Sequence, residues 1–397
     1  MSKIDGRKIK SAFLELSNKS EEDKNKFLLL LSNIIRKKER TIISANDKDV
    51  KEARKNHVSE VFIQRLVIDK SGIEKIIQKV LEIRSLNSGL GKIIEEKKRK
   101  DKLILQKIRV AIGTILVIYE ARPEVTIDVA SLCIKSGNTA ILKGGSEALQ
   151  TNKVFYECIV EALKQANFPK GTVTFIDSKD KQIIKTLIKR NEIIDLIIAR
   201  GGYKMVKNIQ DNSSIPVLAH SSGGARIYID KSADLSIVES IIINSKVTKP
   251  FACNSLDTII LHMDIKEKIY SILKRSLKNH QVKIVKKIWS EEFLGLKVSI
   301  KIVNDIDEAI NFVNIFGKKH SEGIIAEDKK AINKFTQSID AAAIFVNCST
   351  RLHDGYEFGL GSEMGIATGK LHARGPVGLK ELSIYKWIAY GKGHIRK

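Results

Sequence analysis

The segment Ile115-Leu116-Val117-Ile118-Tyr119 is a short apolar run, and a second one follows at Thr139-Ala140-Ile141-Leu142-Lys143. Runs of similar length recur at Val173–Ile176 and Ile194–Ile198, and segments of helical character such as Glu147–Gln165 lie between them. Short apolar runs that alternate with helices predict a parallel sheet covered by helices. In such sheets, ligands bind beyond the carboxyl ends of the strands.

Two glycine-rich breaks fall at those carboxyl ends. One is Lys143-Gly144-Gly145-Ser146 and the other is Arg200-Gly201-Gly202, and a helical segment follows each of them. Glycine lets the backbone approach a phosphate group, and the N-terminus of a helix favours an anion. Because each break also carries a basic residue, we predict a nucleotide site here; the alternative is a pair of simple strand-to-helix turns.

A second α/β region surrounds the stretch Val247-Thr248-Lys249-Pro250-Phe251-Ala252-Cys253-Asn254-Ser255. Short apolar runs follow it at Asp257–His262, Val298–Val303, Gly323–Ala326 and Ala342–Asn347. We therefore expect a second domain that begins near Lys249, with Cys253 in a loop close to the start of a strand. A single cysteine in such a loop is either a reactive nucleophile or a small buried apolar residue.

The amino-terminal part of the chain differs from these regions. Residues 20–56 and 72–85 have apolar residues at helical spacing. Residues 93–110 predict two strands around a charged turn, which would form a hairpin. Such an arm could pair with the sheet edge of another subunit, or it could be an exposed hairpin with a solvated tip.

The composition and charge pattern argue against a nucleic-acid-binding, metal-binding, disulfide-rich, membrane or secreted protein. The chain has 397 residues and a net charge of +23, but its lysines are scattered and no nucleic-acid-binding motif is present, so we expect no nucleic-acid partner. Its four cysteines show no metal-ligand spacing, so we expect no metal and no disulfide framework. The apolar runs are too short for a membrane span and the start does not resemble a secretion signal, which predicts a cytoplasmic protein.

Several strings of the sequence carry a family resemblance. In chain order they are Tyr119-Glu120-Ala121-Arg122-Pro123, Ser136-Gly137-Asn138, Lys143-Gly144-Gly145-Ser146-Glu147, Arg200-Gly201-Gly202, Ala252-Cys253-Asn254, Val346-Asn347, Ser349-Thr350-Arg351 and Leu371-His372-Ala373-Arg374-Gly375-Pro376. Over nearly the whole chain, these strings closely resemble the gamma-glutamyl phosphate reductases, a family of the aldehyde dehydrogenase superfamily.

The resemblance implies an α/β fold of the aldehyde-dehydrogenase type, with two parallel-sheet α/β domains and a small oligomerisation flap. One of these domains would bind the cofactor and the other would be catalytic. The implied boundaries are 1–92 and 111–248 for the cofactor-binding domain, 249–370 for the catalytic domain, and 93–110 with 371–397 for the flap. A homo-oligomer is implied, and glutamate 5-kinase is a possible partner.

The resemblance also implies NADPH-dependent reduction of L-glutamyl 5-phosphate to L-glutamate 5-semialdehyde, a step of proline biosynthesis. Cys253 would form a thioester, with Asn254 beside it in the catalytic group. Oxidising members of the superfamily carry a water-activating glutamate about 33 residues before the cysteine, whereas this chain has His220 there (253 − 220 = 33). His220 is a candidate for proton transfer, and a hydrogen-bonded structural histidine is the alternative.

Further residues take roles by the same resemblance. Lys143, Gly144, Gly145 and Ser146 would meet the adenosine ribose and its phosphate. Arg200, Gly201 and Gly202 would meet the pyrophosphate, and Glu292 the nicotinamide ribose. The substrate would contact Arg122, Glu124, Ser349 and Arg351. Arg351 would bind its α-carboxylate, because the fork of a guanidinium fits a carboxylate.

The sequence departs from the family pattern at two positions. Glu124 stands where the family has asparagine, so this carboxyl group is either protonated or points away from developing negative charge. Arg226 stands in a segment where the family has a Gly-x-Cys-His string. These departures leave an alternative hypothesis open, in which the chain is a catalytically weakened scaffold or a partner of glutamate kinase.

Overall fold

The computed structural model describes residues 4–120, 122–178, 180, 182–220, 223–286 and 288–396, without the side chains of Val61 and His220. The internal contacts divide the chain into two compact units. Unit 1 consists of Met1–Ala219, Gly361–Gly365 and Val377–Lys397, and unit 2 consists of His220–Leu360 and Ile366–Pro376. Among the described residues, no helix is both long and apolar enough to cross a membrane.

A five-stranded sheet forms the centre of unit 1. Its strands are β5 (Val173–Phe175), β4 (Thr139–Lys143), β3 (Thr114–Tyr119), β6 (Leu196–Arg200) and β7 (Val217–His220), in this spatial order. Strands β3 to β6 pair in parallel, as the alternation of apolar runs and helices predicts. The strand order reverses between β3 and β6, and the chain leaves both strands there at their carboxyl ends. This is the position at which open parallel sheets bind ligands.

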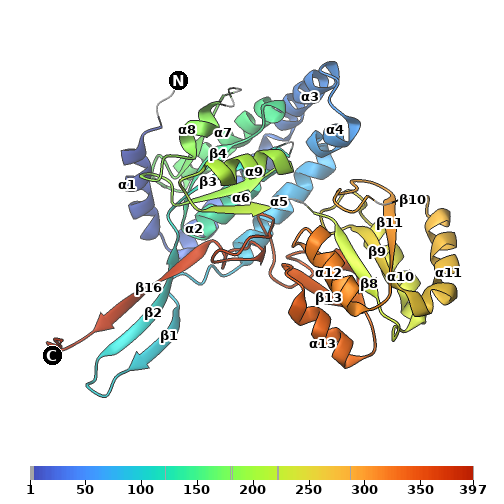
Figure 1. The fold of residues 1–397 in the computed structure, drawn as a ribbon. Helices are drawn as coiled ribbons and strands as arrows, with labels where there is room; N and C mark the ends of the chain where they lie inside the picture. The colour runs from blue at the N-terminus through green and yellow to red at the C-terminus, as the bar shows by residue number, and fades with distance from the viewer. Residues whose placement is uncertain are drawn as a thin grey trace. The chain divides into compact units, whose positions relative to one another are not determined.

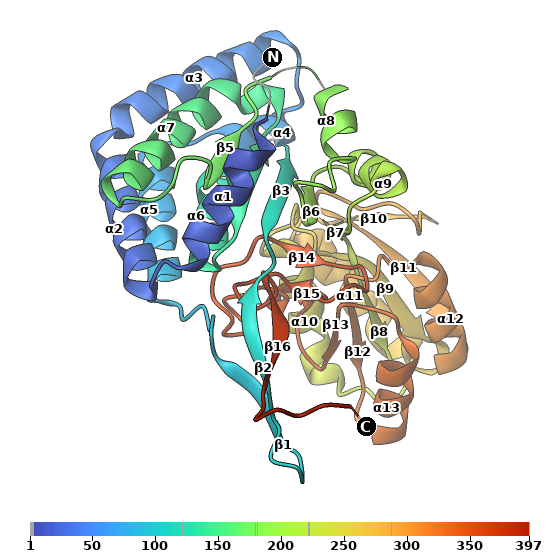
Figure 2. The same cartoon turned by 90° about the vertical axis from the view of Figure 1, so that its left-hand side faces the viewer.

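Helices cover both faces of this sheet. They are α1 (Gly6–Ser17), α2 (Glu21–Lys37), α3 (Glu39–Lys55), α4 (Glu60–Leu66), α5 (Lys70–Ser85), α6 (Val125–Lys135), α7 (Leu149–Gln165), α8 (Gln182–Leu187) and α9 (Tyr203–Asn212). Helices α2, α3, α5, α6 and α7 contact one another on one side (Figure 2). On the other side, residues of α1, α8 and α9 share an apolar cluster with β3 and β4.

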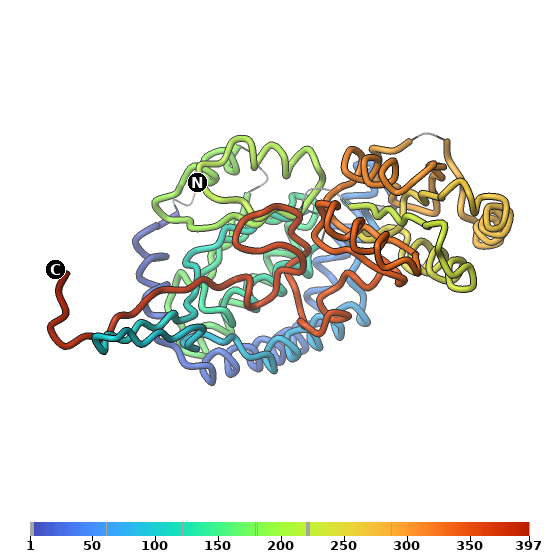
Figure 3. The backbone as a smooth tube through the Cα atoms, turned by 60° about the horizontal axis from the view of Figure 1, so that its bottom comes forward, coloured from blue at the N-terminus to red at the C-terminus, as the bar shows by residue number. Residues whose placement is uncertain are grey.

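A separate three-stranded antiparallel sheet has the order β1 (Ile93–Lys98), β2 (Ile104–Ala111) and β16 (Ser383–Tyr390). The first two strands are the predicted hairpin, and the C-terminal strand runs along its second strand, as Figure 3 shows. The Asn138 side-chain amide donates to the Leu382 carbonyl oxygen at 2.7 Å, and Arg109 donates to the Ser383 hydroxyl at 2.7 Å. These contacts fix the start of the C-terminal strand on unit 1.

Unit 2 contains a six-stranded sheet. Its order is β10 (Lys283–Val285), β11 (Lys297–Val303), β9 (Leu256–His262), β8 (Ala225–Ile229), β12 (Ser321–Ile325) and β13 (Ala343–Val346), and all neighbours pair in parallel. The same unit holds the short pair β14 (Ile366–Ala367) and β15 (Gly375–Pro376). All strands predicted after residue 253 are therefore present in one sheet.

The core of unit 2 follows the two-residue period of its strands. Ile227 and Ile229 of β8 pack in one apolar cluster with α10 (Leu235–Val247) and α11 (Lys266–Asn279). Tyr228, between them, packs on the opposite face with α12 (Ile306–Phe316) and α13 (Lys329–Ser338) (Figure 1). Successive side chains of a strand point to opposite faces, so a strand with helices on both faces is apolar throughout.

The predicted boundary between the two domains differs from the observed division. We expected the second domain to begin at residue 249, but unit 2 already begins at His220. The reason is β8, which pairs with both β9 and β12 in the middle of the second sheet. Helix α10 then connects β8 to β9, so the whole segment before Cys253 belongs to unit 2. Likewise, Ile366–Pro376 lies in unit 2, whereas Gly361–Gly365 and Val377–Lys397 return to unit 1.

Candidate active site

Cys253 lies in the turn between α10 and β9, as predicted, and its side chain is half-buried. Backbone hydrogen bonds hold this turn. Within the turn, the Ser255 N–H donates to the Ala252 carbonyl oxygen at 3.0 Å. The segment before β8 braces it through Gly224 N–H, which donates to the Cys253 carbonyl oxygen at 2.6 Å. The backbone of the cysteine is therefore fixed by hydrogen bonds, and it lies at the amino-terminal end of β9 in the six-stranded sheet.

Gly223 explains how closely the two segments approach each other. A Cβ atom at this position would lie 2.3 Å from the Cys253 carbonyl oxygen and 2.5 Å from the Cys253 Cβ. Real side chains do not tolerate such distances, so a larger residue at 223 would push the Cys253 turn away. The Gly223-Gly224 pair is thus part of the structure that places the cysteine.

A loop from the far side of the sheet encloses the same turn. Its short helix η3 (Thr350–Leu352) follows β13. The buried Asn254 side chain donates to the His353 carbonyl oxygen at 3.0 Å, and Thr350 Oγ1 donates to the Asn254 carbonyl oxygen at 2.8 Å. Because its amide group is used within the unit, Asn254 positions the turn, and these contacts favour that role over contact with a substrate.

Arg351 completes this loop. Its Nη1 donates to the side-chain oxygen of Asn254, the residue next to the cysteine. Its Nε is buried and, among the described residues, has no hydrogen-bond partner. Burial lowers the pKa of the Arg351 guanidinium, and negative charge on Cys253 acts in the opposite direction, which places the two groups within electrostatic reach.

Ser349 has a structural environment. Its side chain accepts the Arg351 N–H at 3.2 Å and lies 3.0 Å from the Ser245 hydroxyl of α10. These bonds cap η3 and attach it to the helix that leads to Cys253. The expectation that Ser349 contacts the substrate stays a prediction.

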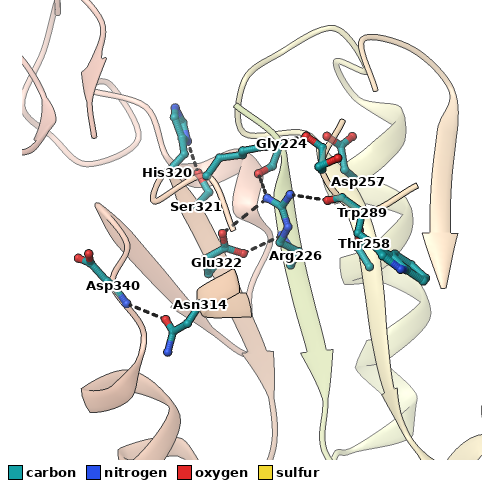
Figure 4. Close-up of polar contacts among 12 residues, drawn as sticks. Gly224, Arg226, Asp257, Thr258, Trp289, Asn314, His320, Ser321, Glu322 and Asp340 are labelled. Atoms are coloured by element: carbon teal, nitrogen blue, oxygen red, sulfur yellow. Dashed lines mark hydrogen bonds and ion pairs between the residues drawn. The ribbon is translucent and has the colours of Figure 1, made fainter. Parts of the chain in front are cut away.

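Arg226, one of the two positions at which the sequence departs from the family pattern, is buried beside Glu322. Arg226 of β8 and Glu322 of β12 are each 1% exposed, and Figure 4 shows their side chains facing each other between the two strands. Glu322 Oε2 accepts the Arg226 backbone N–H at 3.0 Å, and Oε1 lies 3.7 Å from Arg226 Nη1. The guanidinium also donates to the carbonyl oxygens of Gly224 and Trp289. Arg226 is therefore a structural residue that fastens the segment beneath Cys253.

A second buried pair lies in the same unit. Lys246 of α10 is 3.2 Å from Asp257 of β9, and both also bind the backbone of Phe293. Burial lowers the pKa of Lys246, while the charges of Asp257 and Glu292 raise it. Glu292, the predicted nicotinamide-ribose residue, is thus held next to this pair by its neighbour Phe293. Its contact with a cofactor stays a prediction.

Unit 1 brings the first glycine-rich break to the carboxyl end of β4. Lys143 is 5% exposed and donates to the Gly144 carbonyl oxygen at 2.7 Å, and Ser146 is exposed at the start of the short helix η1 (Ser146–Ala148). A Cβ at Gly144 would lie 2.3 Å from Asn152 Nδ2, and one at Gly145 would lie 2.1 Å from a Glu147 carboxylate oxygen. The break is therefore a close turn that leaves a lysine and an exposed hydroxyl beside bare backbone.

The second break contains a carboxylate that we did not predict. Glu120 follows β3, and its Oε2 accepts the Gly202 N–H at 2.8 Å, at the amino end of α9. Its backbone N–H donates to the Arg200 carbonyl oxygen at 3.1 Å, which joins the ends of β3 and β6. The predicted pyrophosphate position thus holds a negative charge from the chain itself. Its signal in the sequence was an acidic residue directly after a buried strand.

Arg122 and Glu124 follow in the same loop. Arg122 is exposed, whereas Glu124 is half-buried at the start of α6. Burial and the nearby Asp128 raise the pKa of Glu124, and the charges of Arg122 and Arg200 oppose that rise. The neutral form of Glu124 is therefore favoured relative to an ordinary glutamate. The guanidinium of Arg200 is close to that of Arg122, and burial lowers its pKa.

His220 is the last residue of β7, and its side chain lies outside the described part of the chain, so its role in proton transfer stays a prediction. In the described ranges, no three histidine, cysteine or acidic residues come together as a metal site. Burial raises the pKa values of Cys133, Cys158 and Cys348, which disfavours the thiolate at those positions.

Comparisons with known proteins agree with this arrangement. Residues 7–287 match the model of the aldehyde dehydrogenase family. The chain is 39% identical to the gamma-glutamyl phosphate reductase of Clostridium kluyveri, over 96% of this chain and 95% of the relative. It is also 39% identical to that of Petrotoga mobilis, over 98% and 97% of the two chains.

A solved structure shows the same likeness. The crystal structure of gamma-glutamyl phosphate reductase from Thermotoga maritima superposes with a TM-score of 0.95 at 36% identity, covering 99% of each chain. An acetylating aldehyde dehydrogenase from Geobacillus thermoglucosidasius, 19% identical with a TM-score of 0.70, shares the fold. From the sequence relatives, the family model and the shared fold together, the chain belongs to the aldehyde dehydrogenase family and, within it, to the gamma-glutamyl phosphate reductases.

Proposed function

We propose that the protein catalyses the NADPH-dependent reduction of L-glutamyl 5-phosphate to L-glutamate 5-semialdehyde and phosphate, in proline biosynthesis. The observation that carries this proposal is the half-buried Cys253 on a braced turn, in a chain of this family. An acyl phosphate is an activated carboxyl group, and a thiolate is the nucleophile suited to displace phosphate from it.

Cys253 carries the covalent chemistry in this proposal. Its sulfur forms a bond to the acyl carbon, and phosphate leaves with the electron pair of the broken C–O bond. The resulting thioester is reduced to a hemithioacetal, whose C–S bond then breaks to give the aldehyde and to return the thiolate. Backbone N–H groups near Cys253 would stabilise the oxyanion.

Water must stay out of this reaction, because hydrolysis of the thioester would waste the activated substrate. The position 33 residues before Cys253 holds His220 and no carboxylate (253 − 220 = 33), so the usual water-activating group of oxidising relatives is replaced. We assign His220 to proton transfer on the aldehyde product.

A nicotinamide cofactor is expected from the family, and we infer that it is NADPH. When bound, it supplies the hydride. The first glycine-rich break fits its phosphate-bearing ribose, because Lys143 contributes a positive charge and exposed Ser146 a hydroxyl beside backbone without side chains. We place the pyrophosphate at Gly201 and Gly202 and the nicotinamide ribose at Glu292.

For the substrate, we assign Arg351 to the α-carboxylate and Arg122 to the phosphate, since guanidinium groups suit both anions. The scaffold hypothesis depends on Glu124 and Arg226, and the surroundings of each residue argue against it. Burial raises the pKa of Glu124, which favours its neutral form more than in an ordinary glutamate and so weakens the conflict with an oxyanion. Arg226 is held by hydrogen bonds to the carbonyl oxygens of Gly224 and Trp289 and supports the fold. We therefore do not favour a catalytically weakened scaffold.

We further infer a cytoplasmic homo-oligomer, with glutamate 5-kinase as a partner that hands over the labile substrate. The three-stranded sheet supports association between copies. Its C-terminal strand exposes Tyr385 and Trp387, each 48% accessible, and Lys107 lies over the Tyr385 ring at 3.9 Å from its centre. Strands β1 and β16 form the edges of this sheet, where another chain could pair.

The experiment is a coupled assay that generates L-glutamyl 5-phosphate and follows oxidation of NADPH. We expect activity in the wild type and in Cys348→Ser, and none in Cys253→Ser with an unchanged circular dichroism spectrum. Full activity of Cys253→Ser would refute the nucleophile assignment. Oxidation of NADPH with acetyl-CoA or acetyl phosphate but not with glutamyl phosphate would refute the substrate.

A further inference from the structure

The guanidinium of Arg351 and the Cys253 turn form one hydrogen-bonded unit. Arg351 donates from Nη1 to the side-chain oxygen of Asn254, and the Asn254 Nδ2 donates back to the Arg351 carbonyl oxygen at 3.5 Å. Asn254 follows Cys253 directly, and Thr350 Oγ1 fixes its carbonyl oxygen at 2.8 Å. The positive charge is therefore attached to the backbone that carries the sulfur, through buried and partly buried hydrogen bonds.

The other charged groups around this turn are bonded elsewhere or exposed. On α10 and β9, Lys246 and Asp257 pair with each other. On β8, Arg226 donates to the carbonyl oxygens of Gly224 and Trp289 and lies beside the Glu322 carboxyl group. Lys249 belongs to the turn itself and is exposed.

On the enclosing loop, Asp354 and Glu357 interact with Arg351 at longer range and raise its pKa, as negative charge on Cys253 does. Among these groups, Arg351 is the cation that is both half-buried and bonded to the residue beside the cysteine.

We propose that Arg351 is a positioning residue that holds Cys253 as a thiolate, through its charge and through Asn254. The inference rests on the proposed function in that Cys253 is the nucleophile there, and it gives Arg351 a task beyond substrate binding. A neighbouring cation stabilises a thiolate relative to the thiol, and partial burial weakens the screening of that interaction by water. Arginine suits the task because its guanidinium stays protonated.

Alkylation of Cys253 tests this without substrate or cofactor. The full-length protein, in a Cys348→Ser background, reacts with iodoacetamide across a pH series, and peptide mass spectrometry quantifies the Cys253 adduct. In the wild type we expect the midpoint of the rate profile below the ordinary thiol value of about 8.5.

In Arg351→Gln, loss of the charge should raise the midpoint by about one pH unit. The rate below the midpoint should then fall about threefold and the rate above it should rise about threefold, because a more basic thiolate is more nucleophilic. Arg351→Lys, which keeps a positive charge, should recover most of the shift.

A slower rate below the midpoint together with a faster rate above it distinguishes an electrostatic effect from structural damage, because structural damage would lower the rate at every pH. Lys334→Gln, which removes a cation from a surface ion pair of the same unit, is the matched control and should leave the profile unchanged. An unchanged midpoint in Arg351→Gln would overturn the inference, even if KM for the acyl phosphate rose.

A wild-type midpoint at or above the ordinary thiol value would also overturn it, whether or not the variants fold. A shifted midpoint in a protein that does not turn over glutamyl phosphate would leave the inference standing and refute the proposed function instead.

Discussion

Replacing Glu322 with glutamine should change how the stability of the protein depends on pH. The carboxyl group of Glu322 is 1% exposed, and burial raises its pKa to about 8 from the usual value of 4.5, against the opposing charge of Arg226. Its Oε1 has no hydrogen-bond partner among the described residues, so one oxygen of the group lacks the bonds that an ionised carboxylate needs.

The raised pKa of Glu322 in the folded state determines whether the free energy of unfolding rises or falls with pH. Between the usual pKa of 4.5 and the folded value of about 8, the folded state binds a proton that the unfolded state has released. The free energy of unfolding therefore falls as pH rises, by about 1.4 kcal/mol per pH unit for this one group. Between these two pH values, the free energy of unfolding of the wild type should fall by up to about 5 kcal/mol, and Glu322→Gln should not show this fall.

Urea unfolding of the wild type and of Glu322→Gln, followed by circular dichroism at about pH 5 and about pH 8, measures this effect. The difference in unfolding free energy should move in favour of the variant as pH rises. Glu308→Gln is the control, because hydrogen bonds from Lys301 and Asn304 lower the pKa of Glu308, so its contribution is lost only at more acid pH. A difference that stays constant with pH would show that Glu322 is ionised throughout, and would refute the reasoning.

Two further predictions concern unit 1. Glu120→Gln removes the negative charge from the amino end of α9 and should tighten NADPH binding about fivefold, since a charge at a helix end is worth about 1 kcal/mol; fluorescence titration measures this, and an equal or weaker affinity would contradict it. Trp387→Lys places a charge on the exposed face of β16 and should shift the protein toward smaller assemblies in sedimentation velocity; an unchanged mass would argue against association through this sheet.

The fold was predictable where burial repeats along the chain. The sheet of unit 1 has strands buried on both faces, so Thr139–Lys143 stands out as an apolar run with the same bounds as β4. The glycine breaks and the position of Cys253 before a strand were predictable because turns and strand starts have local composition signals.

The domain boundary was not predictable in the same way. Strand β8 has the same apolar character as the strands of unit 1, and only its pairing with β9 and β12 assigns it to unit 2. Pairing partners depend on tertiary packing, which local patterns do not encode.

Much of the candidate site was also hidden from the sequence. Arg226 and Glu322 are 96 residues apart, and Asn254 and His353 are 99 residues apart. Such contacts leave one trace in a single sequence, a polar residue inside an apolar run. Lys246 in α10 and Asp257 in β9 show that trace, and each is explained by the other. Arg351 was predicted as a ligand for the substrate, but its bond to Asn254 could not be.

The closing of the three-stranded sheet by β16 has a consequence for synthesis of the protein. Strand β2 ends at Ala111, and its second partner begins at Ser383, so most of the chain must leave the ribosome before the two can meet. Until then β2 keeps an open edge, which can recruit strands from other nascent chains. A product truncated before Ser383 would retain that open edge permanently, and we would expect it to aggregate even though both α/β sheets are complete.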